Sequence, residues 1–346
     1  MLPYLLILFF VLFWITLEQK AINRKSFWLP LVTLVLFFSV RSNQVGTDTQ
    51  VYTYNFDNSL DVKYFDFNEN VELGYQLLEY SILQFTDNYF WLFFISGLMV
   101  VCLYLKVIIK YSVNYLLSIF LFITLGVYTF FFNGLRQGIA MAIFTSALPY
   151  LLERKVIPYV LVCLFASLFH ITGLFMIPFY FLVNLTVKPL YKIISTFLGS
   201  LFISSFLINY LATTNERYEQ YTEASEQAGG LLTLGFYNIL LLFIYLIIRL
   251  YKITDEYTIK LFTFYAVGVV FIIPIAMLGV MASGPQRLLT YFTWTLVLIL
   301  PVIFKKINNI YITSLAVLIF LVYFILTTTT FSNLTPYVIN PRFEIF

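Results

Sequence analysis

YLLSIFLFITLGVYTFFFNGLRQGIAMAIFTSALPY, residues Tyr115–Tyr150, contains a single charged side chain, Arg136. The chain on either side of Arg136 is apolar for long enough to cross a bilayer, which an upright helix does with about 20 residues. A cation at the centre of a membrane helix costs about 2.5–3.5 kcal/mol on insertion scales, so such a residue is seldom accidental. The stretch therefore predicts a membrane hairpin with one retained cation.

The composition extends this reading to the whole chain. The sequence is 61% hydrophobic and 11% charged, with a mean hydropathy of +0.90, whereas soluble proteins contain about 25% charged residues. We predict an all-α polytopic membrane protein forming one integral membrane domain over 1–346. The cysteines, Cys102 and Cys163, lie in apolar runs and are expected to be small buried side chains.

About twelve spans are predicted from hydropathy. Their ranges are 2–17, 27–40, 89–109, 114–132, 138–152, 156–169, 171–187, 190–211, 231–250, 258–281, 288–304 and 310–331. The first run has no basic residue before it, so it is expected to be a retained helix rather than a cleaved signal peptide. The pair over 156–187 is too short for two upright crossings, so it is predicted to be shallow or to turn within the membrane around a wet cavity.

Basic residues are distributed unevenly between the two sides of these spans. If the chain starts outside, fourteen of the 20 lysines and arginines fall on the cytoplasmic side. The outer ones are Arg41, Lys63, Arg136, Arg217, Arg287 and Arg342. This positive-inside pattern predicts that both termini lie outside the cytoplasm. Five of the six outer cations are arginine, whose planar fork suits phosphate or carboxylate.

Two outer segments are predicted. The larger, 41–88, begins with a polar, turn-rich stretch and ends in an amphipathic helix over 72–85 that would lie in the membrane interface. Glu72, Gln76 and Glu79 share one stripe of that helix. The second outer loop, 212–230, is polar and acidic.

Three outer arginines are candidates for binding a pyrophosphate. Arg136 has Asn133 and Gln137 within one helical turn, and Arg287 follows a break at Gly284-Pro285. Arg41 ends the second predicted span. The alternative for each is a headgroup-level anchor that pairs with lipid phosphate.

Three residues are candidates for the base that deprotonates a hydroxyl. His170 is the single histidine of the chain, and its imidazole is a natural proton acceptor near neutral pH. Asp48 and Glu72 are the rival bases. Each has a plainer explanation: a capped carbonyl for His170, an Asx turn for Asp48 and a helix-dipole complement for Glu72.

Four further outer residues are predicted to bind sugar, because aromatic rings stack on pyranoses and amides bind their hydroxyl groups. They are Tyr52, Tyr75, Asn133 and Gln137. No nucleotide-binding motif is present, and one histidine without a cysteine cluster argues against a zinc site. We therefore expect no cofactor, no metal and no nucleic-acid partner.

Several short motifs resemble the EpsG-like family of bacterial polysaccharide polymerases, the Wzy-type enzymes of O-antigen, capsule and exopolysaccharide synthesis. They lie within residues 41–180. The matching pieces are Arg41…Val45-Gly46-Thr47-Asp48-Thr49…Tyr52, Glu72-Leu73-Gly74-Tyr75, Asn133-Gly134-Leu135-Arg136-Gln137-Gly138 and Ala166…Phe169-His170. Each piece is short, but their order and spacing together are fairly specific.

The resemblance implies a glycosyltransferase of the bacterial inner membrane with a helical, GT-C-like architecture and no metal. It would join oligosaccharide repeat units carried on undecaprenyl pyrophosphate, with its active site facing the periplasm or exterior. Donor and acceptor would both be lipid-linked, and a chain-length regulator is a further expected partner beside the bilayer itself. The resemblance does not identify the base.

Two other functions compete with this one. A flippase for lipid-linked oligosaccharide would also have twelve spans and outer arginines, but it predicts charges along a path through the membrane. The predicted span interiors are almost free of charge. A membrane O-acyltransferase would need a donor route from the cytoplasm, and only one histidine is available for acyl chemistry.

Overall fold

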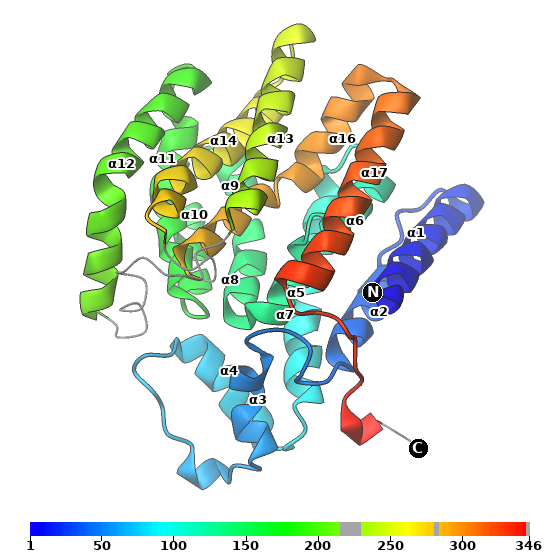
Figure 1. The fold of residues 1–346 in the computed structure, drawn as a ribbon, viewed down its shortest axis with the longest axis vertical. Helices are drawn as coiled ribbons and strands as arrows, with labels where there is room; N and C mark the ends of the chain where they lie inside the picture. Colours follow the sequence, from blue (N-terminus) through cyan, green and yellow to red (C-terminus); the bar gives the residue numbers. More distant parts are fainter. Residues whose placement is uncertain (215–229, 280–283, 344–346) are drawn as a thin grey trace. The chain divides into compact units, whose positions relative to one another are not determined.

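The computed structural model describes residues 1–214, 230–279 and 284–343 and is helical throughout its regular structure (Figure 1). The described residues show a single β contact, an isolated bridge between Arg41 and Ile339. The all-α prediction is thereby confirmed for this part of the chain. The predicted second outer loop lies mostly in 215–229, with Arg217, outside the described residues.

The chain folds into two compact units. Unit 1 comprises Met1–Leu148, Val160–Leu174 and Asn309–Phe346, and unit 2 comprises Pro149–Tyr159 and Phe175–Asn308. Their placement relative to each other is not determined, so each is described separately. The prediction of one membrane domain over 1–346 stays a prediction.

Unit 1 holds most of the motifs singled out in the sequence. Its helices are α1 (Leu2–Ile22), α2 (Trp28–Ser39), α3 (Thr49–Asp57), η1 (Val62–Tyr64), α4 (Leu73–Leu83), α5 (Phe90–Tyr111), α6 (Tyr115–Thr124), α7 (Val127–Asn133), α8 (Leu135–Thr145), α17 (Ile310–Leu326), η5 (Thr327–Phe331) and η6 (Pro341–Phe343). Gly126, at φ 79°, joins α6 to α7 as one continuous span.

Unit 2 is built around α14. Its helices are α11 (Ile177–Asn184), α12 (Pro189–Thr214), α13 (Leu231–Leu250), α14 (Glu256–Met277), η4 (Pro285–Leu289), α15 (Thr290–Thr293) and α16 (Leu296–Ile307). The chain passes between the units within α9 (Leu148–Leu152), α10 (Val156–Ser167) and η2 (Ile171–Met176). The packing of α14 against α12 and α13 buries most of its length.

The twelve predicted spans are not confirmed. Six described helices are long and apolar enough to cross a membrane, or seven if the pair Gln286–Thr293 and Leu296–Ile307, bent by 49°, counts as one span. Four shorter apolar helices cover Trp28–Ser39, Val156–Ser167, Ile171–Asn184 and Pro189–Ser204. A helix of 12 residues such as α10 is about 18 Å long, well short of a bilayer core of about 30 Å.

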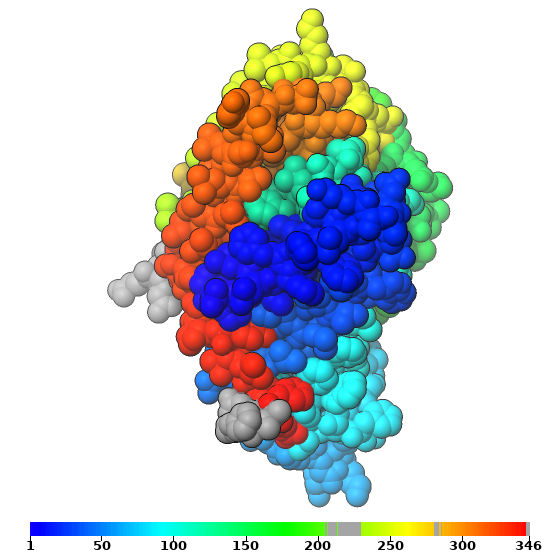
Figure 2. Space-filling view, turned by 90° about the vertical axis from the view of Figure 1, so that its right-hand side faces the viewer, coloured from blue at the N-terminus to red at the C-terminus, as the bar shows by residue number. Residues whose placement is uncertain are grey.

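The long apolar helices differ in how much of their surface the protein covers. α1 and α17, from opposite ends of the sequence, are the most exposed of the six, with 17% and 11% of their apolar windows buried. Both lie on the face drawn in Figure 2. Exposed leucine and phenylalanine over whole helix lengths is what a lipid-facing surface requires.

The first turn of α1 and residues 334–340 lie near the start of the large predicted outer segment in unit 1. The Tyr4 hydroxyl donates to the Leu334 carbonyl at 2.8 Å. The amides of Ser42 and Asn340 donate to the carbonyls of Val338 and Val40, both at 2.8 Å. These bonds join the two ends of the described chain to residues 40–42, while the prediction that both termini lie outside the cytoplasm is not confirmed.

Candidate functional site

Arg136 and Glu72 form a largely buried ion pair in unit 1. The Arg136 Nη1 lies 2.7 Å from the Glu72 Oε2, and the two side chains are 7% and 15% exposed. Arg136 occupies the first turn of α8, after the chain breaks at Gly134. A helix dipole disfavours a cation at that place. The Glu72 carboxylate therefore stabilises Arg136 at this end of α8. The positive end of the helix dipole attracts an anion at the same place.

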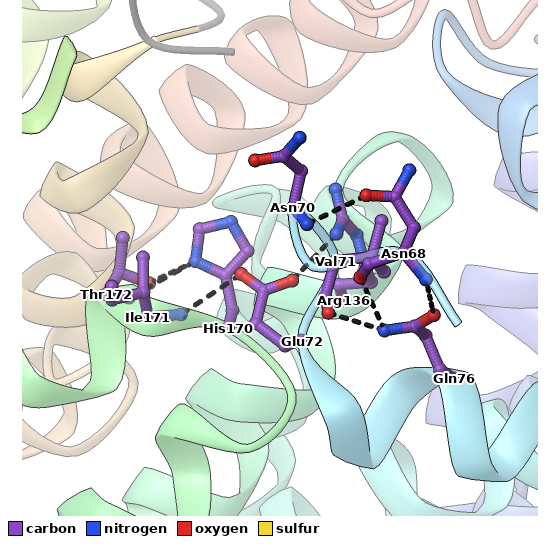
Figure 3. Close-up of polar contacts among 9 residues, drawn as sticks. All are labelled: Asn68, Asn70, Val71, Glu72, Gln76, Arg136, His170, Ile171 and Thr172. Carbon is purple, nitrogen blue, oxygen red and sulfur yellow. Dashed lines mark hydrogen bonds and ion pairs between the residues drawn. The ribbon is translucent and has the colours of Figure 1, made fainter. Parts of the chain in front are cut away.

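The second oxygen of Glu72 reaches the segment that carries His170. The Ile171 amide donates to Glu72 Oε1 at 3.2 Å. The Gly74 amide donates to the Leu168 carbonyl at 2.7 Å. Figure 3 shows the Glu72 carboxylate between Arg136 and the His170–Thr172 segment. Three motifs far apart in sequence thus meet at one carboxylate.

Gly74 is required by the close approach of these two segments. A Cβ atom at this position would lie 2.7 Å from the Leu168 carbonyl oxygen, a backbone atom that cannot move aside alone. Glycine permits such backbone-to-backbone contact. The motif Glu72-Leu73-Gly74-Tyr75 is therefore explained by docking of α4 on the loop after α10.

His170 is half-buried, and its ring orientation is set by Thr172. The Thr172 amide donates to His170 Nδ1 at 3.3 Å, and the Thr172 hydroxyl lies 2.8 Å from the same nitrogen. Because Nδ1 accepts the amide proton, the neutral ring carries its own proton on Nε2. In this arrangement His170 is a hydrogen-bond donor through Nε2 and not a base at that nitrogen.

The polar stripe of α4 faces the protein interior. Gln76 and Glu79 are buried, while Leu73, Leu77 and Phe85 are exposed. Gln76 stabilises the preceding turn. Its Nε2 donates to the backbone carbonyls of Asn68 and Val71, and its Oε1 accepts from the backbone amide of Asn68 (Figure 3). The outward apolar face suits the membrane interface, where the sequence places this helix.

Tyr52 and Tyr75 lie beside Arg136. The Arg136 Cζ is 5.8 Å from the centre of the Tyr75 ring, and the rings of Tyr75 and Tyr52 meet edge to face at 5.9 Å. Both tyrosines are buried. The structure therefore brings two of the predicted sugar-binding residues to the ion pair.

Glu79 is a titratable group of this cluster that sequence reasoning left without a role. Its Oε1 accepts a hydrogen bond from the Asn55 Nδ2 at 2.8 Å. Burial raises the pKa of Glu79, against the opposing effects of the Asn55 hydrogen bond and the positive charge of Arg136. The spacing of seven residues from Glu72 puts Glu79 on the same side of the predicted helix. The sequence does not show whether that side faces the protein or its surroundings.

Arg41 lies apart from this cluster and is fully buried. Its Cζ lies 4.5, 4.3 and 4.8 Å from the ring centres of Phe38, Phe93 and Phe132. Its Nη1 donates to the Val45 carbonyl at 2.6 Å and to the Thr49 hydroxyl at 3.0 Å. Burial lowers the pKa of Arg41 to about 10, so the guanidinium remains charged at neutral pH.

This enclosure bears on the pyrophosphate-binding role expected for Arg41 from the sequence, which stays a prediction. Cation–π contacts with three rings and the bonds of Nη1 enclose the guanidinium, while Nε and Nη2 are buried and have no hydrogen-bond partner. Its outer position suggested a ligand, but three phenylalanines distant in sequence surround it. The bonds of Nη1 to Val45 and Thr49 tie Arg41 to the start of the outer segment.

Asn133 links two segments that are distant from it in sequence. Its Oδ1 accepts from the Thr47 amide at 2.9 Å, and its Nδ2 donates to the Ser332 carbonyl at 2.8 Å. Both ends of the amide are thus bonded within the chain just before Arg136, and the predicted sugar-binding role of Asn133 stays a prediction. Gln137, next along α8, is buried.

Asp48 is half-buried at the start of α3. The residue after it, Thr49, links this helix start to the residues before Arg136, since the Thr49 hydroxyl donates to the Phe132 carbonyl at 3.2 Å.

Arg287 belongs to η4 of unit 2, so the prediction that it binds the same pyrophosphate as Arg136 stays a prediction. Within the described residues, no three His, Cys, Asp or Glu side chains are grouped as metal ligands.

The model of the EpsG family matches residues 25–339. No curated protein and no solved structure matches the chain. The resemblance seen in the short motifs is confirmed and extends over nearly the whole sequence.

Proposed function

Because the chain belongs to the EpsG family, whose members are polysaccharide polymerase-like membrane proteins, we propose that it polymerises a lipid-linked glycan. Its substrates would be oligosaccharide repeat units on undecaprenyl pyrophosphate, joined at the outer face of the inner membrane. The single observation that carries this proposal is the buried Arg136–Glu72 ion pair bonded to the His170 segment.

The reaction needs stabilisation of a leaving pyrophosphate. The acceptor oxygen forms a bond to the anomeric carbon, and the bond from that carbon to the phosphate oxygen breaks with its electron pair. Arg136 and the amino-terminal turn of α8 would hold the resulting negative charge. A guanidinium has five N–H donors, so its bond to Glu72 leaves others for phosphate oxygens.

The reaction also needs a base for the acceptor hydroxyl. Glu72, Asp48 and His170 are the candidates carried from the sequence. The Nε2–H tautomer of His170 suits donation to a phosphate or sugar oxygen better than proton abstraction. Glu72 is engaged by Arg136 and by the Ile171 amide. Tyr52 and Tyr75 would line the sugar side of the site.

Reconstitution tests the proposal. The purified protein in lipid nanodiscs would be given repeat units on undecaprenyl pyrophosphate isolated from the producing strain, and the products separated on a gel. A ladder of longer glycans supports the polymerase. Absence of new bonds, with transfer of the lipid-linked unit across a vesicle membrane, would identify the flippase instead.

Arg136→Ala and Arg24→Ala form a matched pair for this assay. Arg24 also pairs with a glutamate, Glu18, but 60% of its side chain is exposed. The ladder is expected to disappear with Arg136→Ala and to persist with Arg24→Ala. Equal ladders from both variants would remove Arg136 from the site.

A further inference from the structure

Two buried polar groups on α4 have unused hydrogen-bonding capacity. The Tyr75 hydroxyl is buried and has no hydrogen-bond partner. Glu79 is 8% exposed and accepts one bond, from Asn55, although a carboxylate has about four acceptor sites. Residues four apart on a helix share a face, so these two groups are neighbours.

Both groups belong to the surroundings of the Arg136–Glu72 pair. The guanidinium of Arg136 lies over the Tyr75 ring at 5.8 Å, and Glu72 is one helical turn before Tyr75. The α3 helix contributes Tyr52, against Tyr75, and Asn55, against Glu79. A ligand held by Tyr75 and Glu79 would therefore have the Arg136 charge beside it.

The chemistry of the pair defines the group that it would bind. Tyr75 offers a proton to an acceptor, and an ionised Glu79 offers oxygens to a donor. A hydroxyl group does both at once with one oxygen atom. Leaving the Tyr75 hydroxyl buried and unpaired carries a desolvation cost that phenylalanine would avoid.

We propose that the Tyr75 hydroxyl and the Glu79 carboxylate form a subsite for the attacking hydroxyl of the acceptor sugar. Glu79 takes its proton as the sugar oxygen bonds to the anomeric carbon, and the bonding pair of the broken carbon–oxygen bond leaves with the lipid pyrophosphate. This inference rests on the proposed polymerase function. It makes Glu79 a catalytic residue and Tyr75 a substrate-binding one.

Tyr75→Phe is a sharp test, because it removes only an atom without a partner. We expect the variant to unfold at the same temperature as the wild type or higher. Its KM for a free acceptor, the repeat-unit oligosaccharide released by mild acid from the strain's lipid-linked pool, should rise about tenfold. Tyr80→Phe, the same change on an aromatic-packed residue of α4, should leave KM unchanged.

Glu79→Gln tests the proton transfer. Glutamine retains an oxygen for the Asn55 bond but cannot act as the base. We expect kcat to fall by about 10²–10⁴-fold with KM within threefold of wild type. Glu69→Gln, at an exposed position of the same outer segment, is the matched control and should keep wild-type kcat.

Two results would overturn the subsite. Tyr75→Phe with a lowered unfolding temperature and an unchanged KM would mean that a buried water satisfies the hydroxyl. Full kcat in Glu79→Gln would exclude the proton transfer. In either case a wild-type ladder would leave the polymerase function standing.

Failure of the polymerase function is recognised separately. Saturation-transfer NMR measures binding of the same oligosaccharide without any reaction. Binding to the wild type and its loss in Tyr75→Phe, in a protein that makes no ladder, would retain the sugar subsite and reject polymerisation.

Discussion

Arg136 places a permanent charge at the start of α8, and its value for catalysis depends on the geometry of the guanidinium. Arg136→Lys keeps the charge and can keep an ion pair with Glu72, but it loses the planar fork. We expect turnover to fall about 100-fold, as for loss of one oriented donor to a developing charge. Gel ladders from the nanodisc assay measure this.

The same variant should remain folded, because lysine retains the pairing that stabilises Glu72. Unfolding can be followed with a thiol-reactive dye, since Cys163 is fully buried in the folded protein. Near-normal polymer length with Arg136→Lys would argue against bidentate recognition at this position.

Arg41 is expected to show the opposite behaviour, loss of stability without loss of substrate affinity. Arg41→Ala removes cation–π contacts with three rings and two hydrogen bonds, and we expect a loss of about 3 kcal/mol. The dye assay should show a lower unfolding temperature. Below that temperature KM for the lipid-linked donor should match the wild type, and a large rise in KM would restore Arg41 as a ligand.

Glu79 gives the protein a predictable response to pH. Its pKa is raised in the folded protein, so folding favours the protonated form. The resulting stabilisation is complete below the ordinary carboxyl pKa and is lost as pH rises through the raised value. Glu79→Gln cannot titrate. The unfolding temperature of the wild type relative to Glu79→Gln should therefore fall with rising pH, and a constant difference would contradict the raised pKa.

Among the elements, the position of α4 depends directly on the close contact between Gly74 and Leu168. Gly74→Ala would place a methyl group against the Leu168 carbonyl and push α4 off the His170 segment. Displacing Glu72 by about 1 Å can cost about 100-fold in rate, so both ladder formation and unfolding temperature should fall. Gly199→Ala in α12, where nothing lies within 4 Å, is the control and should be neutral or stabilising.

Hydropathy and periodicity predicted several elements well. The span 114–132 corresponds to Tyr115–Asn133, and the helix over 72–85 to α4 at Leu73–Leu83. Sequence reasoning missed α3, because its buried face has helical spacing but is half threonine, so hydropathy does not reveal it; the buried residues are Thr49, Tyr52, Thr53 and Phe56. The count of twelve spans is not confirmed, because apolar runs such as 156–187 divide into helices shorter than a bilayer crossing in the described residues.

The sequence was enough to predict several residues of the site but not the contacts between them. Arg136, Glu72 and His170 were singled out separately, and their common contact at one carboxylate needed the fold. The enclosure of Arg41 involves Phe93 and Phe132, which no local pattern connects to it. Burial of Glu79 depends on which side of α4 faces α3, and periodicity alone does not give that direction.

At the scale of unit 1, the segment after α17 is bonded to the start of the outer segment and to Asn133. The carbonyls of Ser332, Asn333 and Val338 accept bonds from Asn133, Gly46 and Ser42. Ending the chain after Phe331 removes all three bonds and retains α17. We expect faster hydrogen exchange over residues 42–57 and loss of the ladder.

Asp87→Asn is the control for this truncation. It weakens the Arg342–Asp87 pair, whose side chains are about half exposed, and affects the Ser59 hydroxyl that donates to Asp87, but it leaves those three bonds in place. Exchange over 42–57 should stay close to the wild type. Unchanged exchange in the truncated chain would show that the tail does not order this segment.

The exposed face of α4 is apolar, so we expect it to lie against the bilayer rather than in water. Leu73 and Leu77 point away from the protein, while Gln76 and Glu79 point into it. In that predicted position, acyl chains would pack against the helix that begins after Glu72 and contains Tyr75. The lipid composition of a preparation thereby becomes a reaction variable, comparable to ionic strength for a soluble enzyme.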